Sequence, residues 1–237
     1  MRESEAAFAR FRPLAPGSQP AYATPSYRST ALRAPLQPLV LSAAGVTEAS
    51  GPCFSPAHFS ALADLTRVDG GEAQGQRIIV AGSVSDEDGR PVAETMIELW
   101  QANAAGRYRH PTDQHDAPID PHFRGVGRIF TDAQGRYRFV SVRPGSYPWR
   151  NHDNAWRPSH IHFSLFGTGF VQRLITQMYF EGDPLLASDP IFHSVPDRAA
   201  RARLVARFDS TLTEPEWAHG YRFDIVLRGR DASPMEE

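Results

Sequence analysis

A series of short apolar runs, separated by turns that contain aspartate and glycine, constrains the fold more than any other feature of this sequence. Arg77–Val84 is followed by the turn D-E-D-G-R-P and then by the apolar run Val92–Trp100. Gly127–Thr131 and Arg136–Val140 repeat this arrangement around the turn D-A-Q-G. Two β-prone runs that flank a turn of this kind are typical of a β-hairpin. The pattern therefore predicts two hairpins.

Strands are predicted at three further places, and helix is scarce. His160–Phe166, Leu174–Phe180 and Tyr221–Leu227 are the further β-prone runs. One helix is predicted, at Asp197–Phe208, where Asp197 is placed to cap the first turn and apolar side chains share one face. Many short strands with little helix predict an all-β chain, folded as an antiparallel or mixed β-sandwich with long functional loops and one short helix in its C-terminal half.

The first 52 residues differ from the rest of the chain. They are rich in proline, alanine and serine and show little periodicity, so we expect an extended N-terminal arm. The arm contains apolar residues that favour docking on another surface over disorder: Tyr22, Tyr27, Leu32, Leu36 and Leu39. Residues 53–237 show no repeat and no further boundary, so they are expected to form one β-sandwich domain.

Composition excludes several classes of protein. The formal net charge of the 237 residues is −2, which argues against nucleic-acid binding. All 25 cationic residues are arginine, so Schiff-base lysine chemistry is excluded. The single cysteine, Cys53, offers neither an internal disulfide nor a cysteine-rich metal site. With no apolar run near the ~18 residues of a membrane helix and no signal peptide, we expect a cytoplasmic protein.

The stretch Tyr147–Phe163 (Y-P-W-R-N-H-D-N-A-W-R-P-S-H-I-H-F) is the densest in chemically active side chains. Within it, His160 and His162 stand two apart on a predicted strand, so both side chains project from the same face. A pair of imidazoles on one face is well suited to a metal ion, although a structural role for the pair is an equal alternative. Six other histidines are interpreted as structural or surface residues: His110, His115, His122, His152, His193 and His219.

The other donors decide which metal fits the histidine pair. Asp153 and Glu181 are the nearest carboxylates, so a ferrous site with two histidines and one carboxylate has no obvious third ligand. No H-E-x-x-H motif supports a zinc hydrolase. The nearest oxygen donors are Tyr147 and Tyr108, the latter in the long loop Ala102–Val126. Because a phenol has a pKa near 10, a strongly Lewis-acidic ion is needed to hold it deprotonated. These donors favour Fe(III), while buried structural tyrosines and a structural zinc site remain alternatives.

Three motifs, Glu98–His110, Tyr147–Phe163 and Leu174–Leu185, closely resemble the intradiol ring-cleaving dioxygenases. Within that family the resemblance is greatest to the β subunits of the members that cleave protocatechuate, and it extends from Pro25 to Arg228. It implies that residues 53–237 are the catalytic domain and hold one non-haem Fe(III) per chain. The implied iron ligands are Tyr108, Tyr147, His160 and His162.

The same resemblance implies roles for residues around the metal. Arg157 matches the family's arginine beside the substrate ring, Gln177 matches its pocket glutamine, and Tyr147 matches the phenolate that substrate displaces. The implied substrate-binding residues are Tyr27, Trp149 and Ile191, with Arg150 as a further partner for the substrate carboxylate. Trp100 and Tyr179 match residues that flank the ligands. Ser159 and the pair His152-Asp153 depart from the family pattern without touching a ligand position.

The implied reaction is the cleavage of protocatechuate (3,4-dihydroxybenzoate) between its hydroxylated carbons by O2, giving 3-carboxy-cis,cis-muconate in the β-ketoadipate pathway of aromatic catabolism. The implied partner is a homologous, iron-free α subunit, on which the arm of residues 1–52 is expected to dock. The active site would lie at the interface of the αβ unit, in a larger assembly of such units. Two alternatives remain. The first is a catechol or hydroxyquinol dioxygenase, whose N-terminal region is helical rather than proline-rich. The second is a non-catalytic partner subunit.

Overall fold

The strands build a two-layered sandwich. The computed structural model describes residues 14–38, 59–150, 153, 156–166 and 173–235. Nine strands form one continuous hydrogen-bonded sheet: β3 (Arg77–Ser85), β4 (Met96–Trp100), β5 (Val126–Phe130), β6 (Arg136–Val142), β9 (His160–Phe166), β10 (Arg173–Phe180), β11 (Val205–Phe208), β12 (His219–Arg222) and β13 (Ile225–Val226). Two small sheets pair β1 (Arg67–Val68) with β2 (Gly71–Glu72), and β7 (Tyr147–Pro148) with β8 (Trp156–Arg157).

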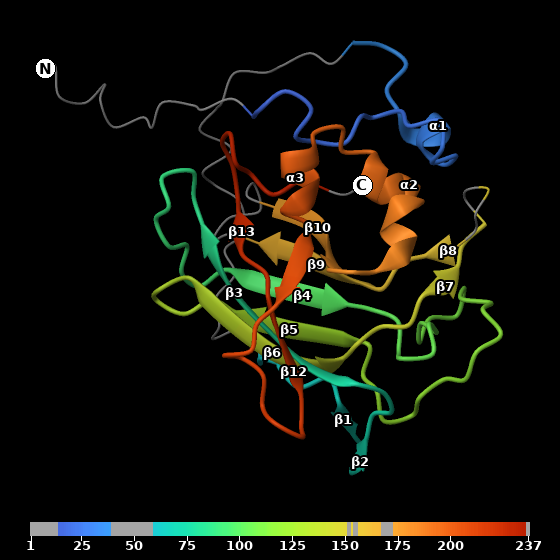
Figure 1. Cartoon of the computed structure of the whole chain (residues 1–237), viewed down its shortest axis with the longest axis vertical. Helices are drawn as coiled ribbons and strands as arrows, with labels where there is room; N and C mark the ends of the chain where they lie inside the picture. Colours follow the sequence, from blue (N-terminus) through green and yellow to red (C-terminus); the bar gives the residue numbers. More distant parts are fainter. Residues whose placement is uncertain (1–13, 39–58, 151–152, 154–155, 167–172, 236–237) are drawn as a thin grey trace, which may run out of the picture.

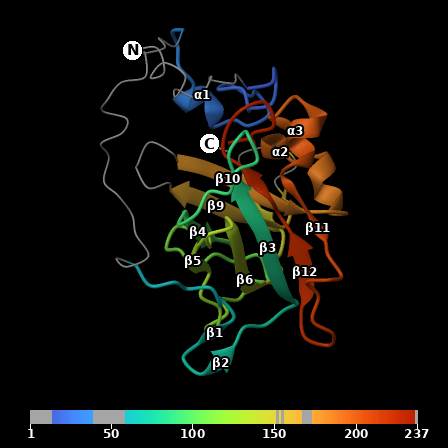
Figure 2. The same cartoon turned by 90° about the vertical axis from the view of Figure 1, so that its left-hand side faces the viewer.

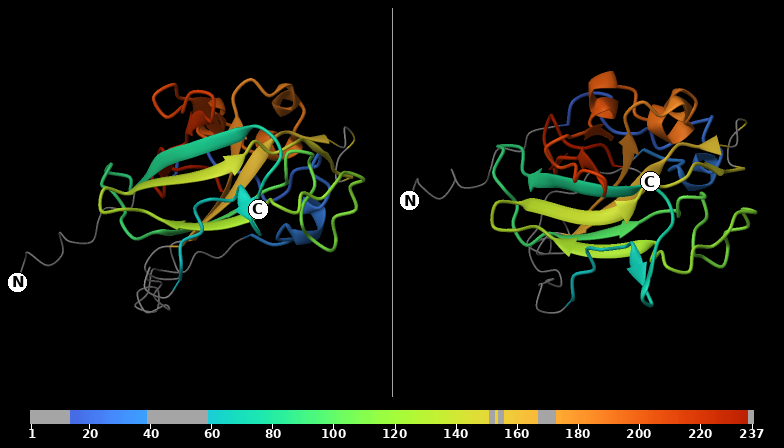
Figure 3. Two further views of the ribbon diagram at one scale, coloured as in Figure 1. Left: turned by 90° about the horizontal axis from the view of Figure 1, so that it is seen from below. Right: turned by 60° about the horizontal axis from the view of Figure 1, so that its bottom comes forward.

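The large sheet folds back on itself, so that its two halves face each other (Figure 3). Its strand order is β13-β3-β12-β11-β10-β9-β4-β5, with β6 also paired to β3. Phe163 of β9 packs edge-on against Phe139 of β6 at a ring-centroid distance of 6.0 Å, and its ring lies 5.2 Å from that of Phe223. All three rings are buried, and burying such rings between two layers is a main source of stability in a sandwich.

The sheet is mixed, and the predicted all-β sandwich is confirmed. Strand β11 pairs parallel with β10 and antiparallel with β12, and β3 pairs parallel with β12 and β13. The remaining pairings in this sheet among the described strands are antiparallel. The long loop between β4 and β5, residues 101–125, contains neither helix nor strand, as predicted.

The two predicted hairpins are wrong beyond their turns. Asp86 accepts hydrogen bonds from the N–H groups of Asp88 and Arg90, so the first turn forms as expected. Pairing then stops at the bridge between Ser85 and Pro91. Strand β3 pairs with β6, whereas β4 pairs with β5 and β9, and the second turn likewise connects β5 to a strand of the other layer. A turn motif reverses the chain, but burial of both layers decides which strands pair.

The predicted helix at Asp197–Phe208 is too long. Its cap is confirmed, because the Asp197 side chain accepts a hydrogen bond from the Ala200 N–H group at 2.7 Å. Helix α3, however, spans only Arg198–Ala202, and β11 follows. Residues 205–208 complete the sheet between β10 and β12, and this tertiary pairing outweighs the local helical pattern.

Short helices cover one end of the sheet. Helix α1 (Thr30–Arg33) lies on the same side as α3 and α2 (Pro190–His193), as Figures 1 and 2 show. A 3-10 turn, η2 (Pro184–Ala187), precedes α2. The structure therefore has more short helices than the single one predicted. In the described part of the chain, no helix has the length and apolar character that crossing a bilayer requires.

The described part of the predicted arm, residues 14–38, packs on its own chain. Gly17 accepts a hydrogen bond from the Asp197 N–H group at 2.9 Å, and Ala21 donates one to the Ser194 carbonyl at 3.3 Å. By contrast, the side chains of Leu32 and Leu36 are 93% and 98% exposed. The other parts of the arm, residues 1–13 and 39–52, lie outside the described residues, so docking of the arm on a partner stays a prediction.

Candidate functional site

The sheet register places five candidate residues on one face. In strands β9 and β10, Gln177 lies opposite His162, and Tyr179 lies opposite His160. On the other side of β9, Trp100 of β4 also lies opposite His162. Directly opposite residues of an antiparallel pair share a face and lie close together. The Trp100 and His162 rings accordingly stack at 4.6 Å with an interplanar angle of 4°.

Tyr147 reaches this face from the small sheet β7–β8. Its hydroxyl oxygen lies 3.3 Å from Nε2 of His160. The Nδ1 atom of His160 lies 2.7 Å from the Pro158 carbonyl oxygen. Since a carbonyl only accepts, Nδ1 carries the proton and the Nε2 lone pair points toward Tyr147. The pairing of Tyr147 with Arg157 in β7–β8 brings a candidate ligand and the candidate arginine onto one short ribbon.

The electrostatic surroundings keep His160 neutral. Its side chain is buried, and burial is the largest influence that holds the pKa of His160 well below its ordinary value. The nearby charge of Arg157 and the neighbouring His162 lower this pKa further, whereas the hydrogen bond to Pro158 opposes the shift. A neutral imidazole with its lone pair directed at other donors is the form that binds a metal ion.

Tyr108 comes from the long loop and completes the group. Its ring centroid lies 5.3 Å from that of Tyr147 and 6.5 Å from that of His162. The rings of His160 and His162 are themselves 4.9 Å apart. The structure therefore brings together all four residues predicted as metal ligands, from three separate segments of the chain.

Asn103 shapes the start of the loop that carries Tyr108. Its Oδ1 accepts hydrogen bonds from the N–H groups of Ala105 and Arg107, both at 2.9 Å, and its Nδ2 donates to the Pro118 carbonyl. Gly106, between these residues, has a φ of 78° and sits so close to β7 that a Cβ atom there would lie 2.3 Å from the Ser146 carbonyl oxygen. Only glycine suits this position.

Asp113 fixes the same loop further along. Its Oδ2 accepts a hydrogen bond from the Tyr108 N–H group at 2.7 Å, and its Oδ1 accepts one from the His115 N–H group at 2.8 Å. Neither Asn103 nor Asp113 was singled out from the sequence. The Asn-x-x-Gly spacing from 103 to 106 is a turn signal that marks the first of them.

The chemistry of the donors fits the metal predicted from the sequence. Among the described residues, no group of three or more His, Cys, Asp or Glu side chains could hold a metal ion. Tyr108 and Tyr147 are described oxygen donors that lie beside His160 and His162. Two neutral imidazoles and two phenols that can ionise suit a hard trivalent cation, because its charge stabilises phenolates.

Arg157 lies beside this group and is almost completely buried, with 3% of its side chain exposed. Its Nη2 donates hydrogen bonds to Oε1 of Gln177 at 2.5 Å and to the Tyr179 hydroxyl at 3.3 Å. Its guanidinium carbon lies 5.2 Å from the centre of the Trp149 ring. The Nε atom lies 3.0 Å from Oδ1 of Asp189, whose carboxylate is fully buried.

The sequence pattern does not point to a role for Asp189 in the site. Asp189 precedes Pro190 at the start of α2, and a capping aspartate followed by proline is a recognisable helix start. That signal predicts the helix, but the ion pair with Arg157 depends on a contact between segments 32 residues apart. No local pattern reports such a contact.

The predicted substrate-binding residues are only partly gathered at the site. Tyr27, which is 9% exposed, packs edge-on against Trp149 at a ring-centroid distance of 5.2 Å. Ile191 is buried on α2. Arg150 is exposed and makes no hydrogen bond or ion pair with another described residue. The interpretation of Arg150 as a substrate partner stays a prediction.

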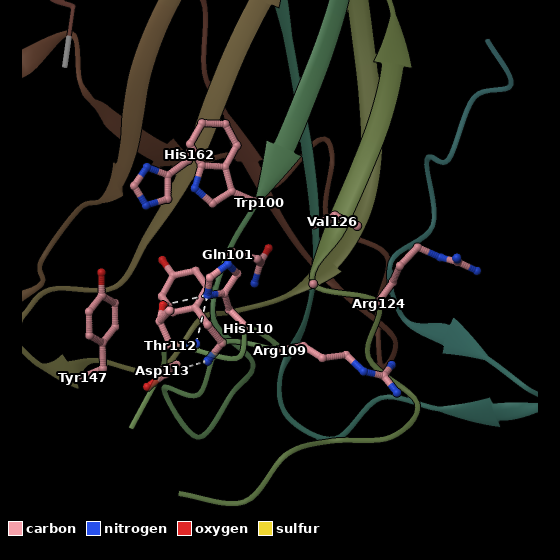
Figure 4. Close-up of a pocket in the computed structure, with 12 residues that line it drawn as sticks. Trp100, Gln101, Arg109, His110, Thr112, Asp113, Arg124, Val126, Tyr147 and His162 are labelled. Carbon is pink, nitrogen blue, oxygen red and sulfur yellow. Dashed lines mark hydrogen bonds between the residues drawn. The ribbon is translucent and has the colours of Figure 1, made fainter. Parts of the chain in front are cut away.

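A cavity of about 450 Å³ opens next to the donors. Trp100, Tyr108, Tyr147 and His162 are among the residues that line it. Figure 4 shows Tyr147 and His162 on one side of the cavity, with Arg109 and Arg124 at the other. Its volume lies within the range of about 300–1,000 Å³ that is usual for small-molecule sites.

Five of the histidines interpreted as structural or surface residues are described by the structure. Nδ1 of His115 lies 2.9 Å from the Gly106 carbonyl oxygen, and Nδ1 of His122 lies 3.0 Å from that of Val68. His110 contacts Thr112 near the cavity rim. His193 and His219 are exposed, and His152 lies outside the described residues.

Two protein-family models match the chain. The family model described as "Dioxygenase" matches residues 49–229, and the model described as "Protocatechuate 3,4-dioxygenase beta subunit N terminal" matches residues 12–42. The chain is 57% identical over 222 residues to the protocatechuate 3,4-dioxygenase beta chain of Burkholderia cepacia, covering 92% of this chain and 94% of that one. It is 32% identical over 162 residues to the alpha chain from the same organism, covering 67% and 76% of the two chains.

A solved structure supports the fold. The dioxygenase domain of a dioxygenase and carbohydrate-binding protein fusion from Streptomyces sp. SirexAA-E aligns with a TM-score of 0.52 and 27% sequence identity. The alignment covers 76% of this chain and 94% of that chain.

Proposed function

Because the chain belongs to the intradiol dioxygenase family, whose members use non-haem iron, we propose that it cleaves protocatechuate with O2 between the two hydroxylated carbons. The observation that carries this proposal is the cluster of Tyr108, Tyr147, His160 and His162 on one face of the sheet. The product would be 3-carboxy-cis,cis-muconate, which retains both atoms of O2. Similarity to the Burkholderia cepacia beta chain along nearly its full length supports the choice of substrate.

The four clustered residues would hold one Fe(III). Bound there, Fe(III) would supply Lewis acidity, which would lower the pKa values of the catechol hydroxyls. His160 is neutral and its Nε2 lone pair faces Tyr147, so this nitrogen can bind a metal ion. The phenols of Tyr108 and Tyr147 can ionise and bind the same ion.

Tyr147 is positioned to take up a proton from the substrate. The hydroxyl oxygen of Tyr147 lies next to His160 Nε2. Tyr147 belongs to a strand of only two residues, so fewer backbone hydrogen bonds restrain it than restrain His160 in the central sheet. We propose that Tyr147 would give way to the substrate and that its phenolate oxygen would accept one hydroxyl proton.

Arg157 would stabilise the negative charge that develops on the bound ring. A guanidinium stays protonated at all physiological pH values, and its planar shape lets it lie against a π-system. The hydrogen bond that Arg157 donates to Gln177 Oε1 leaves the Gln177 Nε2 group as a hydrogen-bond donor, and this atom has no partner among the described residues. Tyr27, Trp149 and Ile191 would form the apolar wall, and Arg150 together with Tyr27 would meet the substrate carboxylate.

The partner proposed for this chain is a homologous α subunit without iron. The similarity to the Burkholderia cepacia alpha chain and the match of residues 12–42 to an N-terminal model specific to beta subunits support such a pairing. Leu32 and Leu36, exposed on and beside α1, offer apolar surface for it. We expect an αβ unit with the active site at the interface, in a larger assembly.

Oxygen uptake by the chain purified together with its α partner tests the proposed function, with protocatechuate and catechol compared as substrates. We expect preferential uptake with protocatechuate and a red-brown protein, because phenolate-to-Fe(III) charge transfer absorbs visible light. Preference for catechol would overturn the proposed substrate. A colourless, folded protein that contains zinc would overturn the iron site. A coloured protein that turns over neither catechol nor protocatechuate would indicate a non-catalytic subunit.

A further inference from the structure

Asp189 is a fully buried carboxylate to which the proposed mechanism assigns no role. Its Oδ1 lies 3.0 Å from Nε of Arg157, and its Oδ2 accepts from Nη2 of Arg157 at 3.4 Å. Both side chains are almost completely shielded from water, with 3% of Arg157 and none of Asp189 exposed. A buried charge is tolerated only when it is paired, so each of the two groups depends on the other.

The pairing restrains the guanidinium. Nε of Arg157 lies within ion-pair distance of Asp189, and Nη2 donates one hydrogen bond to it, so two nitrogens of one guanidinium contact the same carboxylate. The other side-chain hydrogen bonds of Arg157 that the structure shows go to neutral groups, those of Gln177 and Tyr179. Asp189 therefore brings a buried negative charge to this guanidinium.

The same carboxylate also begins α2. Its Oδ2 accepts a hydrogen bond from the Phe192 N–H group at 3.3 Å, so Asp189 is the N-cap of the helix. Ile191, which the proposed function places in the substrate wall, is the second residue of α2. One side chain therefore anchors both the arginine and the helix that carries an apolar wall residue.

We propose that Asp189 is a positioning residue that holds the Arg157 guanidinium and the start of α2 in a fixed relation to the reacting ring. This inference rests on the proposed function. Asp189 acts through Arg157 and does not touch the substrate. Replacing a buried ion pair by apolar side chains often leaves stability unchanged or improves it, so a gain in stability does not explain why this pair is present. Its effect on the position of the Arg157 charge beside the metal donors does explain it.

Asp189→Asn is the informative variant, because asparagine keeps the size of the side chain and its oxygen can still cap α2. We expect the protein to retain its iron, its colour and the spectral change on anaerobic binding of protocatechuate. The kcat should fall on the order of 10²-fold, the effect of a small displacement of a positioned group. KM should change far less.

Asp197→Asn is the matched control. Asp197 caps α3 through the Ala200 N–H group as Asp189 caps α2. No hydrogen bond or ion pair in the described residues joins Asp197 to Arg157. Its replacement should leave kcat unchanged, so a similar loss in both variants would overturn the proposal by assigning the effect to helix capping.

The pair of variants Arg157→Gln and Arg157→Gln/Asp189→Asn separates positioning from a general effect on folding. The double variant has no unpaired buried charge and is expected to fold even if Asp189→Asn alone does not. If Asp189 acts through Arg157, the double variant should have the kcat of Arg157→Gln. A further loss in the double variant, or an Asp189→Asn protein with unchanged kcat, would overturn the proposal. Failure of the unchanged protein to cleave protocatechuate would instead overturn the proposed function.

Discussion

The candidate ligands fall into two groups that are held in place by different means. His160 and His162 sit on β9, a central strand that pairs along its length with β4 and β10. Tyr108 and Tyr147 sit on a long loop and on a two-residue strand. Sheet register places the histidines through many backbone hydrogen bonds, whereas a few side chains and one close glycine contact place the tyrosines.

This difference corresponds to what the proposed reaction asks of each group. Ligands that stay bound throughout a catalytic cycle benefit from a rigid scaffold, while a ligand that departs must not be fixed in that way. Tyr147, which we propose leaves on substrate binding, is attached to the smaller ribbon. Tyr108 is intermediate, because its loop is irregular but is tied down by Asn103 and Asp113. Substitutions in the two groups should therefore differ in kind.

The largest effect is expected for His160→Ala. The imidazole presents a neutral nitrogen to the other donors, and alanine leaves nothing to replace it. Loss of a residue that only orients a ligand typically lowers metal affinity about 10–100-fold. We expect His160→Ala to lower the affinity for iron by more than this, and the iron content and the activity to fall with it. Metal analysis and visible absorption measure this. His193→Ala, which removes an exposed histidine, is the control. Full iron occupancy in the His160 variant would contradict the ligand assignment.

A smaller and different effect is expected for Tyr108→Phe. Phenylalanine keeps the ring that packs edge-on against Tyr147, so the loop should keep its fold. Loss of one phenolate should shift or weaken the visible charge-transfer band and reduce kcat on the order of 10²-fold, the scale for losing one electrostatic contact to the reacting centre. Visible spectroscopy and steady-state kinetics measure both. An unchanged spectrum would mean that Tyr108 is not a ligand.

Asn103→Ala tests whether the loop depends on its own capping side chain. The change removes the acceptor of the Ala105 and Arg107 N–H groups and the donor to the Pro118 carbonyl. We expect the free energy of unfolding to fall by about 1–3 kcal/mol, the scale for leaving buried polar groups unsatisfied. Iron should still bind through the sheet histidines, with an altered charge-transfer band. Urea unfolding measures the free energy, and metal analysis measures the iron content. Complete loss of iron would show that binding by the sheet histidines depends on the loop that carries Tyr108.

The same contrast explains which parts of the molecule could be predicted from the sequence. The strand at His160–Phe166 and the common face of its two histidines follow from the period of a β-strand, and the structure places that strand at the predicted residues. The predicted helix at Asp197–Phe208 is too long because residues 205–208 form a strand that pairs with β10 and β12. This pairing depends on segments outside the helical pattern, so the local sequence does not predict it.

The residues that support the site were the hardest to predict. Asp113 and Asp189 are ordinary aspartates in a loop and at a helix start, and their importance comes from partners brought near by the fold. The four proposed ligands were found through residue types and family motifs, which can be read without knowing the contacts. The hydrogen bonds that orient the ligands and their neighbours cannot be read in that way.

The smallest effect is expected at a turn outside the candidate site. Hydrogen bonds from Thr211 and Arg222 hold the pKa of Asp209 at about 2, and they join the end of β11 to β12. Because the folded-state pKa is below the value of about 3.9 in unfolded chains, ionised Asp209 stabilises the fold above pH ~4 and loses this effect as the pH falls toward 2. Asp209→Asn should thus lower the thermal unfolding midpoint slightly at pH 7, and the difference should narrow below pH ~4. Iron content and kcat should not change. A change in either would show that this end of the sandwich is coupled to the ligands.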